Sequence, residues 1–315
     1  MWAYLIRRLG QGIVVVFVVS IIVFTLLHFV PGGPAKTILG PRASPQQIAY
    51  FNKEYGFDSP LPVQYFAWLN QVVHLNLGVS YRLNEPVAAL IATFLPRSVL
   101  LVAPSLFIAL TIAVPLGILQ AVKRNQLPDH IITASAFVFY SMPTFWLGIL
   151  LITFFAIDIP IFPPEAPQST SIQGIIVQAN GLVLPIMTLT LVSVALFSRY
   201  MRSSAVENLV QDYVRTAKAK GVPEFRILYR HVLKNALIPI ITLIGLNLPG
   251  IFAGALVTES LFNYPGMGYL FWQAALTRDY PVLLGILIIV SLATVFGSLL
   301  ADVLYALADP RVRYK

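Results

Sequence analysis

Six long apolar runs dominate the pattern of hydrophobic and polar positions along this chain. An α-helix needs about 20 mostly apolar residues to cross the hydrocarbon core of a bilayer. Arg7 and Arg8 precede the first run, but its apolar length exceeds the roughly 7 to 15 residues of a signal-peptide core, so it is predicted to be a retained anchor. The pattern predicts an all-α polytopic membrane protein with six transmembrane helices, near residues 9–30, 97–121, 131–157, 181–199, 236–258 and 282–306.

A long segment of mixed polarity, residues 31–96, separates the first two runs. It is too long for a plain connection, and its Gln, Asn, Tyr and Trp content around Pro60 to Leu77 predicts a small packed subdomain over the outer mouth. So short a segment leaves little room for a core of its own, so an independent domain is not expected. The predicted organisation is 1–30 with the first span, 31–96 as the extracytoplasmic subdomain, 97–306 as a five-helix core, and 307–315 as a tail.

Composition excludes a soluble globule, because 57% of residues are hydrophobic, 11% are charged and the mean hydropathy is +0.79. The net charge of +8 does not indicate a nucleic-acid partner, since the basic residues flank apolar runs. Most Lys and Arg residues lie at the N-terminus, after the second span, between Arg199 and Lys234, and in the tail. The positive-inside rule therefore predicts that both termini and the 200–235 segment are cytoplasmic.

Helix breakers recur within the predicted spans. Proline in a membrane helix frees a carbonyl group that must find another partner, and such breaks are typical of helices that line a cavity. Pro and Gly are also simply common in membrane helices, so both interpretations stay open. The breakers are Pro104, Pro115, Pro143, Pro185 and Pro249, with Gly245, Gly250 and Gly254.

The cytoplasmic segment between the fourth and fifth spans predicts two helices joined by a tight turn. The first is expected to run from Ser203 to Lys220, with Ser203 or Ser204 as its N-cap. Gly221 is placed where a left-handed residue ends a helix, and Pro223 suits the first turn of the next helix.

The second helix of this segment is expected to be amphipathic. Phe225, Leu228 and Val232 predict a stripe that packs inward, with basic residues on the other side. One interpretation is a platform that docks a soluble partner, and the other is a basic helix pair held by anionic lipid. The small residues Thr216, Ala217, Ala219 and Gly221 favour the protein partner, because they permit close backbone approach.

The stretch Arg215-Thr216-Ala217-Lys218-Ala219-Lys220-Gly221 resembles the EAA loop of ABC-transporter permeases, whose pattern is Glu-Ala-Ala, three residues, then Gly. Ala217 and Gly221 conform, whereas Arg215 and Thr216 replace the Glu and the first Ala. Nearly the whole chain resembles the B-type subunit of dipeptide and oligopeptide importers. One departure is Gly33, at a position where this family often has Asp. The matching stretches are 7–9, 30–35, 77–80, 86–87, 141–148, 235–239, 258–268, 278–281 and 309–311.

The resemblance implies a type I ABC importer permease fold in the inner membrane of a prokaryote. It implies a homologous second permease subunit, two ATP-binding subunits and an extracytoplasmic solute-binding protein as partners, besides membrane lipid. The residues expected to couple to the ATPase are Arg215, Thr216, Ala217, Lys218, Gly221, Val222, Pro223 and Phe225.

The chain offers little chemistry of its own. It has no Gly-x-x-x-x-Gly-Lys-Ser/Thr phosphate loop, so ATP hydrolysis is assigned to partner chains and this chain is not expected to be an enzyme. It has no cysteine, and its four histidines stand singly, so neither a metal site nor a cofactor is expected. Asp158, Glu259 and Asp302 near span ends suit either a proton relay or headgroup water, and Asp302 is expected to pair with a basic residue.

The predicted function is one half of the translocation pathway of an ATP-driven importer for dipeptides or oligopeptides. The same machinery with a nickel chelate, glutathione or an oligosaccharide as cargo stays open. A secondary transporter driven by an ion gradient is a second class, but no paired buried carboxylates or inverted repeat favour it. A membrane-anchored scaffold is a third.

Overall fold

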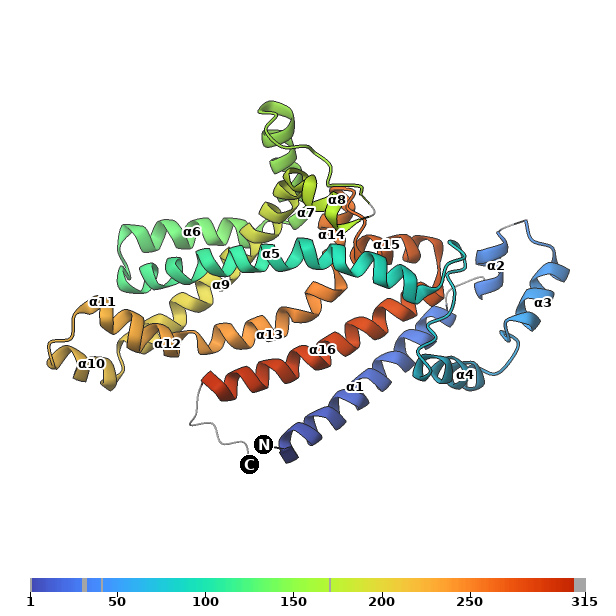
Figure 1. Ribbon diagram of the computed structural model, residues 1–315, viewed down its shortest axis with the longest axis horizontal. Coiled ribbons are helices and arrows are strands. Elements are labelled where there is room, and N and C mark those ends of the chain that lie inside the picture. Colours follow the sequence, from blue (N-terminus) through green and yellow to red (C-terminus); the bar gives the residue numbers. More distant parts are fainter. Residues whose placement is uncertain (1, 30–32, 41, 170, 309–315) are drawn as a thin grey trace.

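The part of the chain that the structure describes is almost entirely helical, and its long helices lie side by side (Figure 1). The structure is a computed structural model and describes residues 2–29, 33–40, 42–169 and 171–308. The predicted matches at Val30, Pro31 and Gly32 and at 309–311 lie outside these residues. The α-helices are α1 (Trp2–His28), α2 (Gly33–Leu39), α3 (Pro45–Glu54), α4 (Leu61–Val73), α5 (Val87–Val122), α6 (Leu127–Ser141), α7 (Thr144–Ile152), α8 (Ile172–Val177), α9 (Val183–Leu209), α10 (Asp212–Ala219), α11 (Glu224–Ile227), α12 (Leu233–Ala236), α13 (Ile238–Ala253), α14 (Leu256–Leu261), α15 (Met267–Thr277) and α16 (Tyr280–Ala308).

Three further short segments are helical but not α-helical. Two are π-helical, η1 (Thr153–Asp158) and η3 (Leu228–Val232), and η2 (Ala179–Leu182) is a 3₁₀ turn that leads into α9. The described residues contain no strand, only an isolated bridge between Val79 and Pro86.

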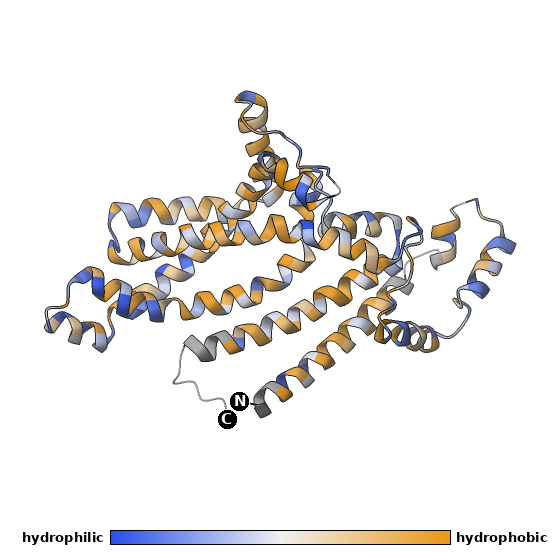
Figure 2. Ribbon diagram, viewed as in Figure 1, coloured by the Kyte–Doolittle hydropathy of each residue, from blue (hydrophilic) through white to orange (hydrophobic). Residues whose placement is uncertain are grey.

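Among the described residues, the structure has five apolar segments long enough to cross a membrane, and the predicted six if one bent helix pair counts as a span. Five are single helices or helix runs, and the sixth is the pair formed by α6 with α7 and η1, which is bent by 102°. Hydrophobic residues predominate along most of the length of these helices (Figure 2). The second span differs from its prediction, because α5 begins at Val87 and has 36 residues. At a rise of about 1.5 Å per residue, such a helix is about 54 Å long and extends beyond an apolar core of about 30 Å.

Only some of the predicted helix breakers break a helix. The chain bends at Pro143, between α6 and α7, and α13 ends at Gly254, which has a φ of +76°. By contrast, α5 continues through Pro104 and Pro115, and α13 continues through Pro249. The long interface that α5 forms with α9 holds the helix together, including a close approach of Gly117 to Met201.

The buried core is divided along the length of the bundle. One cluster joins α5 and α9 to α10, η3 and the start of α13. Others join α5 to α15 and α16, and α7 to α9 and α14. Helices α10 and α11 lie at one end of the molecule, and α2, α3 and α4 lie at the opposite end (Figure 1). The predicted cytoplasmic and extracytoplasmic segments are therefore separated by the full length of the spans.

Candidate functional site

The predicted cytoplasmic platform corresponds to residues 211–236, here called the coupling segment, between α9 and α13. Its first helix is shorter than expected, because α9 continues to Leu209 and α10 begins only at Asp212. Ser203 and Ser204 lie inside α9 and cap nothing. The neighbouring Ala205 is fully buried, so packing of α9 against the bundle overrides the capping preference of serine.

The turn of the coupling segment has the predicted geometry. Gly221 has a φ of +72°, in the left-handed region that follows a helix end. Its amide donates to the carbonyl of Lys218 at 3.0 Å, and the amide of Val222 donates to the carbonyl of Ala217 at 3.1 Å. This is the Schellman pattern, which satisfies carbonyl groups at the end of α10. Pro223 immediately precedes α11 and is not part of its first turn.

The inward face of the second helix differs from the predicted stripe. Phe225 is 79% exposed, whereas Ile227 and Val232 are buried and Leu228 is half-buried. Ile227 and Val232 are five positions apart, and the π-helical η3 lies between them. Because a π turn takes i to i+5 bonds, it returns a side chain to the same face after five residues. The 3.6-residue period therefore predicted Val232 and, in part, Leu228 correctly, but it placed Phe225 on the buried face where the structure has Ile227.

The buried face attaches the coupling segment firmly to the spans. Val214 and Ala217 of α10, with Ile227 and Val232, belong to one apolar cluster. The partners of these residues in the spans are Ala113 and Ala121 of α5, Phe197, Met201 and Ala205 of α9, and Ile240 of α13. Ala217, one of the predicted coupling residues, is only 6% exposed, so its side chain packs within the chain. The coupling segment is therefore packed against three spans.

The outward face combines cations with an aromatic pair. Of the predicted coupling residues, Arg215, Thr216, Lys218, Gly221, Pro223 and Phe225 are exposed, and Val222 is half-buried. Phe225 and Tyr229 are 79% and 68% exposed, and their rings stack at 6.3 Å with an interplanar angle of 6°. The segment has six basic residues against two acidic ones. Such a face suits a protein surface with an apolar groove and acidic rim.

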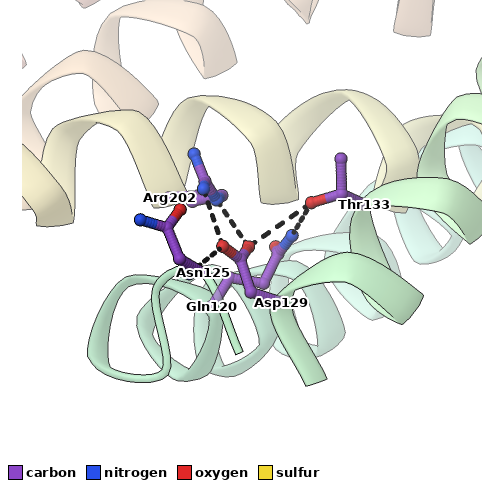
Figure 3. Close-up of polar contacts among 5 residues, drawn as sticks. All are labelled: Gln120, Asn125, Asp129, Thr133 and Arg202. Atoms are coloured by element: carbon purple, nitrogen blue, oxygen red, sulfur yellow. Dashed lines mark hydrogen bonds and ion pairs between the residues drawn. The ribbon is translucent and has the colours of Figure 1, made fainter. Parts of the chain in front are cut away.

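A buried ion pair at the same end of the bundle escaped the sequence analysis (Figure 3). Asp129 of α6 is 2% exposed and accepts from Arg202 of α9 at 2.7 Å and 2.8 Å, in a two-pronged pair. The carboxylate also accepts from the amide of Asn125, and Gln120 of α5 donates to Thr133, which donates to Asp129. The cluster therefore ties α5, the α5–α6 turn and α6 to α9, ten residues before α10 begins.

One sequence signal could have indicated Arg202. Ser198 lies four residues before it and Ala205 three residues after it, and these small residues at helical spacing indicate a packing face that includes Arg202. An arginine on the packing face of a membrane helix needs a partner of opposite charge. The identity of that partner, 73 positions away, does not follow from spacing.

The three acidic residues that were noted near span ends lie in three different environments. Asp302 pairs with Arg8 at 3.0 Å, as predicted. Asp158 is exposed at the end of η1. Glu259 is fully buried and accepts from Ser98 Oγ at 2.7 Å and from the amides of Ala255 and Tyr269. These bonds hold α14 and the start of α15 against α5.

Comparisons with known proteins cover the whole length of the spans and the coupling segment. Residues 113–314 match the family described as binding-protein-dependent transport system inner membrane component, and residues 1–102 match the N-terminal family of such membrane components. The chain is 37% identical to the oligopeptide transport system permease protein AppB of Bacillus subtilis, over 100% of both chains. It is 35% identical to the dipeptide transport system permease protein DppB of Alkalihalophilus pseudofirmus, again over 100% of both.

A relative whose name gives glutathione instead of a peptide class is about equally similar. The glutathione transport system permease protein GsiC of Escherichia coli is 36% identical, over 99% of both chains. Matches of this extent to two family models and to full-length relatives show the family directly. The chain belongs to the inner-membrane permease components of binding-protein-dependent ABC transport systems.

Proposed function

We propose that this chain is one of two permease subunits of an ATP-driven importer, and that the coupling segment receives the movement of the ATP-binding subunits. The observation that carries the proposal is the two-sided build of this segment. Its outer face presents the Phe225 and Tyr229 rings among cations, and its inner face packs on α5, α9 and α13. A pull on the rings therefore acts on three spans together.

The proposed cargo is a dipeptide or oligopeptide. The names of the relatives AppB and DppB support this class, whereas the name of GsiC supports glutathione. Uptake of a labelled peptide panel by the reconstituted complex, with glutathione and a nickel chelate beside it, separates these cargoes. Uptake that requires an ion gradient and not ATP would favour a secondary transporter instead.

The proposed topology places both termini and the coupling segment in the cytoplasm and α2 to α4 outside. The distribution of Lys and Arg supports it, because the basic coupling segment lies at one end of the bundle. The outer segment then faces the solute-binding protein, and a homologous permease subunit completes the pathway. Anionic lipid would contact the exposed cations around the segment.

The turn at Gly221 provides a test of the proposal. Gly221→Val is expected to reduce ATP-driven uptake at least several-fold while ATP hydrolysis continues, because a β-branched residue is unfavourable at a φ of +72°. No atom lies within 4 Å of an added Cβ, so the effect comes from the backbone and not from a clash. The measurement is the ratio of peptide transported to ATP hydrolysed in proteoliposomes.

Gly221→Asn is the matched control, because Asn adopts the left-handed region more readily than other residues with a Cβ. It is expected to keep most of the uptake. A wild-type ratio in Gly221→Val would contradict the assignment of this turn to coupling.

A further inference from the structure

A cavity of about 560 Å³ lies at the end of the molecule opposite the coupling segment. Its walls come from α3 and the turn after it, from α4, and from residues 76–84. The floor comes from Phe24 of α1 and from Tyr280, Pro281 and Leu284 at the start of α16. Neither the coupling segment nor the ion pair of Asp129 contributes residues to the lining of this cavity. The coupling role proposed above therefore does not account for the cavity.

The lining of the cavity is aromatic and neutral. The rings of Phe51, Tyr55 and Phe57 stack on one another, with 4.3 Å between the centroids of Phe51 and Tyr55. Tyr81 meets Tyr55 edge-on at 6.2 Å. Burial, and then the negative charge of Asp279, raise the pKa of Tyr81 well above its usual range, so this hydroxyl stays uncharged.

Among the described residues that line the cavity, none carries a charge, and the polar ones are amides and hydroxyls. A charged group that entered would lose water without gaining a charged partner in the lining, and the carboxylate of Asp279 behind the wall already accepts from Ser80 and Tyr81, so entry is costly. The free termini of a short peptide and the phosphate of a lipid are therefore poor occupants. A neutral aromatic or aliphatic group is a good one, because it can stack on the rings.

The most exposed residues of the cavity lining belong to the outer segment. The lining residues Tyr55, Val63 and Val79 are 53%, 55% and 48% exposed, and they belong to the outer segment. The floor residues Phe24 and Tyr280 are only 5% and 4% exposed. The exposed part of the lining is therefore on the outer segment, where a partner on the outer side would dock, and the buried floor is on the spans.

Hydrogen bonds hold the walls in place. Gln64 Nε2 donates to the carbonyls of Phe57 and Ser59, which braces the turn between α3 and α4. Asp279 accepts from Ser80 Oγ and from the amide of Tyr81, which fastens the facing wall to the residue before α16. The cavity is thus largely pre-formed, as binding sites commonly are.

We propose that this cavity receives an aromatic or aliphatic side chain from a loop of the solute-binding protein when that protein docks. The inference rests on the proposed function, because it needs such a partner on the outer side. The occupant would contact Tyr280 and Leu284 in the first turns of α16. Docking on the outer segment would then bring the partner into direct contact with a membrane span.

The test fills the cavity with a ring from the chain itself. Ala67 lines the cavity from α4, and Ala67→Trp is expected to raise the Kd of the purified, peptide-loaded binding protein at least tenfold. Asn70→Trp is the matched control, since Asn70 is exposed on the same helix and does not line the cavity. The Kd is measured on the complete complex in nanodiscs, with ATP hydrolysis in the absence of binding protein as the check on assembly.

A second pair of variants removes a ring instead of adding one. Tyr55→Ala is expected to raise the same Kd several-fold, whereas Tyr50→Ala, at a 70% exposed ring of α3 outside the lining, leaves it unchanged. This pair of variants tests the proposed docking cavity if Ala67→Trp fails to insert into the membrane.

The outcomes separate the two proposals. Wild-type Kd values in both cavity variants would overturn the inference and leave the importer intact. Loss of a bound lipid from Ala67→Trp, seen by mass spectrometry, with an unchanged Kd would also overturn it. A wild-type complex that neither binds the loaded protein nor imports peptide would instead overturn the proposed function.

Discussion

Arg202→Ala is expected to destabilise the protein by about 3 kcal/mol, because it leaves the carboxylate of Asp129 buried without its partner. Breaking a buried pair typically costs about 3–5 kcal/mol, and the 31% exposed side chain of Arg202 places this pair at the lower end. Uptake is expected to fall with it, since the pair joins α6 to α9 just before the coupling segment. The midpoint of thermal unfolding in detergent and uptake in proteoliposomes measure the two effects.

A double variant tests whether the loss of stability comes from the unpaired buried charge. Asp129→Leu combined with Arg202→Met removes both charges, and replacement of a buried pair by apolar residues is often neutral for stability. The double variant is therefore expected to unfold near the wild-type temperature. If Arg202→Ala alone unfolds at that temperature too, the pair does not hold α6 to α9 as described.

Glu259→Ala is expected to be the second severe change. Glu259 is fully buried, and its carboxylate accepts from Ser98 Oγ and from the amides of Ala255 and Tyr269 at 2.7, 3.1 and 2.9 Å. Each buried donor left without a partner costs about 1–3 kcal/mol, so the total loss is expected to exceed about 3 kcal/mol. The amount of folded protein in the membrane fraction and its unfolding midpoint are the measurements.

The surrounding glycines explain why little can compensate for the lost carboxylate. An added Cβ at Gly254 or Gly266 would lie 2.6 Å from the carboxyl group, and at Gly268 it would meet the backbone of Leu256. The backbone therefore encloses this side chain tightly. Glu165→Ala, at an exposed carboxylate, is the control and is expected to behave as wild type. Equal behaviour of the two variants would show that the buried contacts are dispensable.

Features set by a single stretch of sequence were predicted well. The spans follow from apolar length, because a bilayer leaves a helix few alternatives. The left-handed turn at Gly221 follows from local backbone sterics, and the structure confirms it. The pairing of Asp302 with a basic residue was also expected, because an acid at such a depth requires a partner.

Features set by packing were not predicted. The extension of α9 through Ser203 and Ser204 depends on contacts with α5, and the π turn at η3 shifts the buried face by one residue. The pair of Asp129 and Arg202 joins residues 73 positions apart, and Ser80 and Asp279 are 199 apart. No period or local preference in the sequence connects such partners, so only the three-dimensional arrangement identifies them.

Photo-cross-linking from the exposed ring position of the coupling segment tests the central claim most directly. The chain has no cysteine, so Phe225→Cys can carry a single benzophenone label, and Leu83→Cys, 50% exposed at the opposite end, is its control. In the assembled complex, the label at Phe225→Cys is expected to form an adduct with an ATP-binding subunit, and the label at Leu83→Cys is not. An adduct from Leu83→Cys, or none from Phe225→Cys in a complex that hydrolyses ATP, would contradict the account.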